Sequence, residues 1–130
     1  MTNDELIDIA KKASEYSYSP YSHFRVGAAL ECDDGTVFTG CNVENSSYGA
    51  TCCAERTAVF SAAAKGHRKF RRIAIVGTPD GSFGEMTYPC GVCRQVLSEF
   101  CTPDFSVVMT DKSGVHSVSF SELMPHPFEL

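Results

Sequence analysis

Two short cysteine-bearing segments constrain this chain more than any other feature. The segments are ThrCysCysAlaGluArg at 51–56 and ProCysGlyValCys at 89–93, and each places cysteine where a helix is expected to begin. A thiol is easily buried as a small apolar group, but the charged side chains of Glu55 and Arg56 need partners when they are buried. We therefore expect a fold that brings the two helix starts together to form a site there.

Composition limits the kinds of protein that this chain can be. Its 130 residues, of which 43% are hydrophobic and 21% charged, predict one globular domain over residues 1–130. No apolar run approaches the roughly 18 residues that span a bilayer, so no membrane partner is expected. The formal charge of −5 argues against nucleic acid as a partner and favours a small-molecule substrate.

Cysteine usage points to a reducing compartment. The chain has seven cysteines, and its first residues are acidic where a secretory signal would be positively charged. An odd number of cysteines cannot all pair, and free or metal-bound thiols are typical of the cytoplasm. We therefore predict a cytoplasmic protein without a disulfide framework.

Hydrophobic periodicity and turn signals predict the order of elements. The expected helices are 4–15, 52–65, 90–100 and 121–124, and the expected strands are 25–32, 36–43, 73–76, 106–110 and 115–119. AspAspGly at 33–35 predicts an antiparallel hairpin, and AspLysSerGly at 111–114 predicts a second tight turn. This order predicts an α/β domain in which helices cover both faces of a mixed sheet.

The later segment has the spacing of a metal site. Cys90 and Cys93, at the start of a helix, bring two thiols to one side of a turn, which suits tetrahedral zinc with Zn–S distances near ~2.3 Å. A helix N-terminus also favours the thiolate form. The same spacing occurs in redox dithiols, but a third cysteine at Cys52 or Cys53 favours metal.

Three protein ligands with an open position are typical of catalytic zinc. There the pKa of a bound water falls from ~15.7 to about 7. Glu55 follows Cys53 by two residues, so its carboxylate is placed to accept the proton of that water. The competing reading is a structural zinc module with four protein ligands, in which Cys52 joins and Glu55 has no role.

The same residues resemble a known family. Residues 53–56, CysAlaGluArg, and 89–95, ProCysGlyValCysArgGln, are similar to the zinc-dependent cytidine deaminases of the small homotetrameric class. The segments 19–29, 42–45 and 122–125 also resemble blocks of that family. The resemblance implies a three-layer α/β/α sandwich around a five-stranded mixed sheet.

The resemblance also implies the roles of the central residues. One zinc ion per chain would be held by Cys53, Cys90 and Cys93. Glu55 would be the catalytic proton shuttle, and Arg56 would offset the negative charge of three thiolates on one zinc ion. A shifted register would use Cys52 instead, but only Cys53 keeps the CysAlaGlu spacing of the family.

The implied activity is hydrolytic deamination of free cytidine and 2′-deoxycytidine to uridine and 2′-deoxyuridine plus ammonia, as in pyrimidine salvage. Zinc hydroxide would attack C4 of the base. The alternatives are a related cytosine nucleoside such as a nucleoside antibiotic, a nucleotide, or a base in nucleic acid. Two features favour the free nucleoside. Deaminases of nucleotides and nucleic acids more often use histidine as the first ligand, where this chain has cysteine. The short turn at 111–114 makes the last two strands antiparallel, unlike the crossover expected in nucleic-acid editors.

Substrate residues follow from the same resemblance. Asn42 and Glu44 would bind the ribose 3′-hydroxyl, Phe24 would pack on the base, and the backbone at Ala54 would read the polar edge of the base. Tyr48 and Phe128 would reach a neighbouring subunit, which implies a homotetramer with composite active sites. Without the resemblance, Phe24 would be read as ordinary core and Asn42 and Glu44 as loop residues.

The remaining candidate ligands are given structural roles. Cys32, Cys41 and Cys101 are predicted to be core residues. The four histidines, His23, His67, His116 and His126, show no ligand spacing in the sequence and are predicted to be structural or surface residues.

Overall fold

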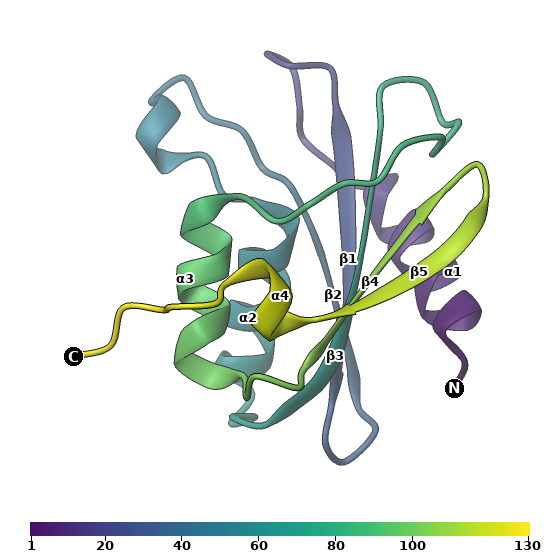
Figure 1. Cartoon of the computed structure of the whole chain (residues 1–130). Coiled ribbons are helices and arrows are strands. Elements are labelled where there is room, and N and C mark those ends of the chain that lie inside the picture. The colour runs from purple at the N-terminus through teal and green to yellow at the C-terminus, as the bar shows by residue number, and fades with distance from the viewer.

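A computed structural model, which describes residues 1–130, contains one five-stranded sheet with helices on both faces (Figure 1). The helices are α1 (Asn3–Ser14), α2 (Ala54–Ala64), α3 (Gly91–Phe100) and α4 (Phe120–Leu123). The strands are β1 (Arg25–Cys32), β2 (Val37–Cys41), β3 (Phe70–Thr78), β4 (Ser106–Asp111) and β5 (Gly114–Ser119). The predicted α/β fold class is confirmed.

The strands lie in the order β2-β1-β3-β4-β5. Strand β1 pairs antiparallel with β2 and β3, β3 pairs parallel with β4, and β4 pairs antiparallel with β5. The parallel pair requires a crossover, which α3 supplies. The start of α3 therefore follows the carboxyl end of β3, the edge where ligand sites form in α/β folds.

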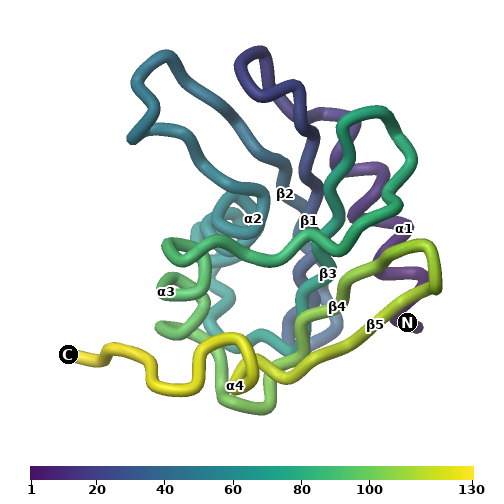
Figure 2. Tube along the Cα trace, turned by 45° about the horizontal axis from the view of Figure 1, so that its top comes forward, coloured from purple at the N-terminus to yellow at the C-terminus, as the bar shows by residue number.

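Two apolar layers hold the helices to the sheet. Helix α1 covers one face, and α2, α3 and α4 lie on the other, as Figures 1 and 2 show from two directions. Along β1 the alternation sends Ala29 toward α1 and Ala28 and Leu30 toward α2, which is the period of a strand buried on both faces. No helix has the length and apolar character that crossing a membrane requires.

Several boundaries differ from the sequence prediction, and the differences have physical causes. Helix α2 begins at Ala54 rather than Cys52, because Cys53 is its N-cap and has extended backbone angles. Strand β3 is longer than 73–76 and begins at Phe70. The charged residues near its start concealed the strand in the sequence pattern. Arg72 is paired with the buried Glu31 of β1 rather than left in solvent.

The first turn of α2 packs directly on β2. A Cβ at Gly40 would lie 2.3 Å from the carbonyl oxygen of Ala54 and 2.4 Å from Oγ1 of Thr57. Only glycine allows so close an approach. Thr57 Oγ1 also donates to the carbonyl of Cys41 at 2.9 Å, so the start of α2 is fixed against the end of β2.

Candidate active site

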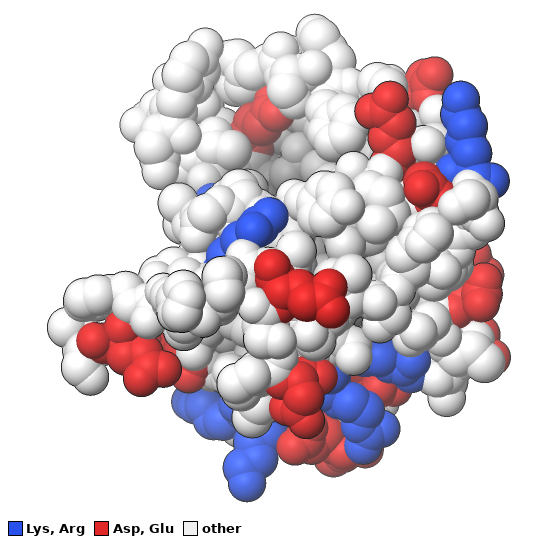
Figure 3. Space-filling view, in the orientation of Figure 1, with Lys and Arg blue, Asp and Glu red and all other residues white.

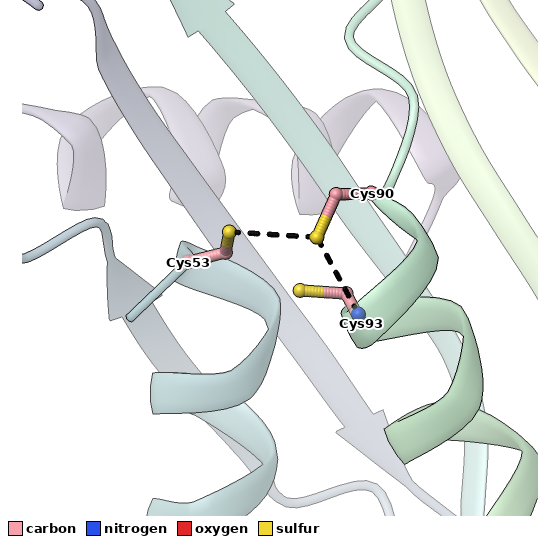
Figure 4. A group of neighbouring side chains, drawn as sticks. All are labelled: Cys53, Cys90 and Cys93. Atoms are coloured by element: carbon pink, nitrogen blue, oxygen red, sulfur yellow. Dashed lines mark hydrogen bonds between the residues drawn. The ribbon is translucent and has the colours of Figure 1, made fainter. Parts of the chain in front are cut away.

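Three cysteine side chains converge where α2 and α3 begin (Figure 4). Cys53 is the N-cap of α2, Cys90 is the N-cap of α3, and Cys93 lies in the first turn of α3. Their Sγ atoms all lie within 4.8 Å of one another, and those of Cys53 and Cys90 are 3.7 Å apart. Cys52 is outside this cluster, and its backbone pairs with Val43 in an isolated bridge.

The cluster fits zinc. Sulfur ligands at ~2.3 Å from a tetrahedral centre are about 3.8 Å apart, which matches the separation of 3.7 Å between Cys53 Sγ and Cys90 Sγ. Cys90 Sγ also accepts a hydrogen bond from the backbone N–H of Cys93 at 3.5 Å, so the side chain caps the start of α3. Three sulfur donors leave one tetrahedral position for a water or a substrate atom.

The thiols of Cys53 and Cys93 affect the pKa of each other, and Arg56 lies beside them. A hydrogen bond from the Cys93 thiol, together with Arg56, lowers the pKa of Cys53 to about 5, although burial acts in the opposite direction. The same hydrogen bond and burial raise the pKa of Cys93. Arg56 Nη2 donates to Cys53 Sγ at 3.6 Å and to the carbonyl of Thr51 at 3.2 Å. The sequence prediction of a cation beside the sulfurs therefore has a geometric counterpart.

Glu55 is a buried carboxyl beside the sulfurs. It lies in the first turn of α2 and is only 4% exposed. Burial raises its pKa to about 7, and the negative charge of Cys53 acts in the same direction. A carboxyl with a pKa near neutrality can both accept and return a proton in the physiological range.

Two polar residues fix the segment that carries Phe24. The amide oxygen of Asn42 accepts from Ser17 Oγ and from the N–H of Val26 at 2.9 Å, and its Nδ2 donates to the carbonyl of Phe24 at 2.9 Å. One N–H of the Asn42 amide is left for a ligand. Asn42 therefore positions Phe24 in addition to any contact with substrate.

Glu44 holds the same segment through hydrogen bonds to Tyr21 and Ser22. Its carboxylate accepts from the N–H of Tyr21 at 2.9 Å, from the N–H of Ser22 at 3.1 Å and from the Ser22 hydroxyl. The hydroxyl of Ser22 is the main cause that lowers the pKa of Glu44, so the group is an anion with acceptor capacity for a further hydroxyl.

Phe24 lines a cavity, whereas Ala54 is buried at the start of α2. Phe24 borders a cavity of about 300 Å³ that is also lined by Gly77, Met86 and Thr87, and none of the three clustered cysteines lines this cavity. Ala54 is fully buried, and its N–H begins α2 without an intrahelical acceptor. That free N–H is the group available to a polar base edge.

Tyr48 and Phe128 are directed to solvent within one chain. The side chain of Tyr48 is 77% exposed, and its ring packs edge-on against Tyr21 with the centroids 6.0 Å apart. Phe128 is 66% exposed, and only its carbonyl is bound, by Gln95 Nε2 at 3.1 Å. Neither ring is brought to the cysteine cluster by the fold of a single chain.

Sequence reasoning gave no role to Arg94, which holds the turn before Cys90. Its Nε donates to the carbonyl of Pro89 at 2.8 Å and its Nη1 to that of Leu123 at 2.7 Å. The guanidinium thus links the start of α3 to α4. The signal was its place four residues after Cys90, where a helical side chain reaches back over the preceding turn.

Comparison with known proteins agrees with this geometry. The model of the "Cytidine and deoxycytidylate deaminase zinc-binding region" matches residues 1–109. A cytidine deaminase of Sporosarcina psychrophila is 45% identical over 98% of this chain and 92% of its own, and one of Halalkalibacterium halodurans is 44% identical over 98% and 95%.

Solved structures give the same answer. The crystal structure of cytidine deaminase from Burkholderia pseudomallei is 50% identical, covers 98% of this chain and 100% of its own, and superposes with a TM-score of 0.89. That of Mycobacterium tuberculosis is 37% identical over 100% and 99%, with a TM-score of 0.83. The chain belongs to the cytidine and deoxycytidylate deaminase zinc-binding family. It is a zinc-dependent deaminase.

Proposed function

We propose that this enzyme deaminates free cytidine and 2′-deoxycytidine by hydrolysis, giving uridine or 2′-deoxyuridine and ammonia. The observation that carries the proposal is the buried carboxyl of Glu55, with its pKa raised to about 7, beside three convergent sulfurs. Structural zinc modules have no use for such a carboxyl. The relatives named above as cytidine deaminases support the choice of substrate.

Cys53, Cys90 and Cys93 are the residues that would hold one zinc ion per chain. When bound, zinc ionises a water near neutral pH and supplies the nucleophile for C4 of the base. Glu55 accepts the proton of that water and delivers it to N3 of the base. In a second transfer it takes the proton of the newly formed C4 hydroxyl and passes it to the departing amine. Since the carboxyl is shielded from solvent, both protons stay within the site.

Arg56 keeps the cluster from becoming too electron-rich. Three thiolates on Zn²⁺ carry a net charge of −1, which weakens the pull of the metal on oxygen. The donation from Arg56 Nη2 to Cys53 Sγ withdraws part of that charge. The free N–H groups at the starts of α2 and α3 act in the same direction.

Substrate contacts are proposed for six residues. Phe24 packs on the pyrimidine ring, the remaining N–H of Asn42 and the carboxylate of Glu44 bind the ribose 3′-hydroxyl, and the N–H of Ala54 meets the base edge. The hydrogen bond from Asn42 Nδ2 to the Phe24 carbonyl supports a pocket in which the residue at the base and the residue at the sugar are linked. Tyr48 and Phe128 are proposed to enter a neighbouring site.

The last proposal requires an oligomer. Four tyrosines in the first 48 residues, Tyr16, Tyr18, Tyr21 and Tyr48, are each at least 48% exposed. Aromatic residues are enriched in the interfaces between proteins. We propose a homotetramer with composite active sites, in which each chain is a single catalytic domain over 1–130. The enzyme is proposed to act in the cytoplasm in pyrimidine salvage. No nucleic-acid or membrane partner is proposed.

The substrate is tested by ammonia release from four compounds under equal conditions: cytidine, 2′-deoxycytidine, deoxycytidylate and single-stranded DNA. The zinc-loaded enzyme is expected to act on the two nucleosides, with kcat/KM for deoxycytidylate lower by at least about 100-fold because the Glu44 carboxylate in the proposed sugar site repels an added phosphate. A preference for deoxycytidylate would overturn the proposed substrate. Turnover of a modified cytosine nucleoside in place of cytidine would support the nucleoside-antibiotic alternative.

A further inference from the structure

A second group of candidate ligands lies far from the deaminase site. Cys32, Asp34 and His67 bring a thiol, a carboxylate oxygen and an imidazole nitrogen within 4.8 Å of one another. Cys32 is the last residue of β1, Asp34 lies in the β1–β2 turn, and His67 follows the end of α2. Figure 1 shows this turn and the end of α2 at the opposite end of the sheet from the start of α3.

The β1–β2 turn holds two of the donors in place. The N–H of Cys32 donates to the carbonyl of Thr36 at 2.8 Å, and the N–H of Gly35 donates to that of Cys32 at 2.9 Å. The N–H of Thr36 then binds Asp34 Oδ1 at 3.0 Å. This leaves the other carboxylate oxygen, Oδ2, free to face the end of α2.

The end of α2 delivers the imidazole to the same place. Gly66 has a φ of 90°, which ends the helix, and the N–H of His67 returns to the carbonyl of Ala62 at 3.0 Å. The imidazole ring packs edge-on against Phe38 of β2 with the centroids 5.0 Å apart. Its backbone and its ring are therefore both held.

Cys32 is buried in the apolar core, yet it is one of the residues that line a surface cavity. The residue is 0% exposed, and the pairing of β1 with β3 shifts register between Glu31 and Cys32. Such an irregularity changes the direction of a side chain at a strand end. Cys32, Asp34 and His67 all line one open cavity of about 320 Å³.

The separation of His67 and Asp34 suits a shared metal ion better than a hydrogen bond. His67 Nδ1 and Asp34 Oδ2 are 3.7 Å apart, which is too long for a direct hydrogen bond. Ligand atoms on one tetrahedral zinc ion lie about 3.3–3.8 Å apart. Sulfur, nitrogen and oxygen donors together are the set that zinc accepts in proteins.

The charges around the cavity do not oppose a cation. Asp33 adds a second carboxylate to its lining, and Arg68 and Lys69 are the basic residues there. The guanidinium of Arg68 is turned to the carbonyls of Ala63 and His67 at 2.7 and 3.0 Å, where it caps the end of α2. Figure 3 shows acidic and basic side chains intermingled over the lower part of the molecule.

We propose that Cys32, Asp34 and His67 form a second zinc site, separate from the catalytic one, with a water in the fourth position. Zinc there joins the β1–β2 turn to the end of α2. Helix α2 has 11 residues, which is about 16 Å of helix, and its other end carries Cys53. A metal ion would thus fix α2 at both ends, and the role of the second ion is structural.

Zinc stoichiometry tests this proposal directly. The purified full-length enzyme is dialysed against a range of free zinc concentrations, and bound zinc per chain is measured for wild type, Asp34→Asn, His67→Gln and the control His126→Gln. Wild type and the control are expected to reach two zinc ions per chain, and the two variants one. Both substitutions are at or near the surface, so folding is preserved, and ammonia release from cytidine should be unchanged.

Two further measurements identify the thiol. With cobalt in place of zinc, the thiolate charge-transfer absorption per chain should fall in Cys32→Ser but not in the control Cys101→Ser. Added to enzyme that already holds one zinc ion per chain, excess zinc should raise the Tm of wild type and leave that of His67→Gln unchanged. One zinc ion per chain in wild type at saturation, or equal binding by wild type and His67→Gln, would overturn the proposal; neither result bears on the proposed deaminase activity.

Discussion

At the scale of single residues, the arrangement around the sulfurs explains why two charged side chains follow Cys53. Glu55 and Arg56 point from the same helical turn, but they meet different partners. Glu55 is buried and its pKa is raised to about 7, whereas Arg56 is hydrogen-bonded to a sulfur and stays protonated. One residue is suited to move a proton and the other to hold a fixed positive charge.

Replacing the fixed charge should weaken the metal site. In Arg56→Gln the donor to Cys53 Sγ is lost, and the zinc affinity is expected to fall about 10–100-fold, as is typical when a partner of a metal ligand is removed. Competition with a chromophoric chelator measures this affinity. Lys12→Gln, which removes one exposed positive charge on α1, is the control, and equal affinity in the two variants would contradict the role of Arg56.

At the scale of elements, the site depends on how closely α2 approaches β2. Gly40→Ala would place a methyl group 2.3 Å from the Ala54 carbonyl, so the start of α2 must move. We expect a loss of about 1–3 kcal/mol in the free energy of unfolding, which is typical of overpacking, and weaker zinc binding because Cys53 shifts with the helix. Denaturant unfolding and zinc titration measure the two effects.

Gly49→Ala is the matched control for Gly40→Ala. A methyl group there meets nothing within 4 Å. Its free energy of unfolding and its zinc affinity should stay near those of wild type. Equal losses in the two variants would mean that the packing of α2 on β2 does not position Cys53.

The far end of β1 supplies a pH-dependent link between elements. Glu31 is 4% exposed and accepts from Arg72 of β3 at 2.8 Å, and Arg72 also reaches Asn3 of α1. The hydrogen bond from Arg72 lowers the pKa of Glu31 below 4.5. The stabilisation is therefore present above pH 4.5 and is lost as the pH falls through the folded-state value.

Glu31→Gln should accordingly destabilise the protein only where the carboxyl is ionised. We expect a loss of about 1.5–3 kcal/mol near pH 7, the range of hydrogen bonds to charged groups, and a smaller difference from wild type in acid. Urea unfolding at pH 7 and pH 3.5 measures this, with the exposed Glu5→Gln as control. A difference between wild type and variant that does not change with pH would contradict the link.

The elements were more predictable from sequence than the contacts between them. Apolar periodicity predicted α1 and the hairpin of β1 and β2, and the turn at 111–114 predicted the antiparallel β4 and β5. The start of β3 was missed because local patterns cannot tell that Arg72 will be paired across the sheet. His67 was read as lacking ligand spacing because its neighbours Cys32 and Asp34 are more than thirty residues away in sequence.

At the scale of the whole molecule, one chain contains the cysteine cluster and Glu55, and the family match agrees with this cluster. The proposed roles of the three clustered cysteines and of Glu55 could be predicted because these residues lie in short motifs, which are visible in the sequence. The proposed roles of Tyr48 and Phe128 require a neighbouring subunit, and within one chain both side chains are exposed. Their exposure leaves the proposed composite sites to a test on the oligomer.

Subunit complementation provides that test. Glu55→Gln and Tyr48→Ala are expected to be weakly active alone, each lacking one part of a composite site. Co-expressed, they should regain about a quarter of wild-type activity, because random assembly places an intact Glu55 beside a neighbour's intact Tyr48 in that share of the sites. Activity no greater than the average of the two parents would contradict composite sites.

The central claim is that three cysteines hold zinc while Glu55 moves the proton, and one paired measurement tests it most directly. Glu55→Gln and the exposed control Glu5→Gln are purified, and catalytic-site zinc and ammonia release from cytidine are determined on the same samples. The account predicts that Glu55→Gln retains its zinc and loses about 10²–10⁴-fold in kcat, the usual contribution of a positioned acid–base group, while the control is unaffected. Loss of zinc together with activity, or near wild-type kcat with zinc retained, would contradict the account.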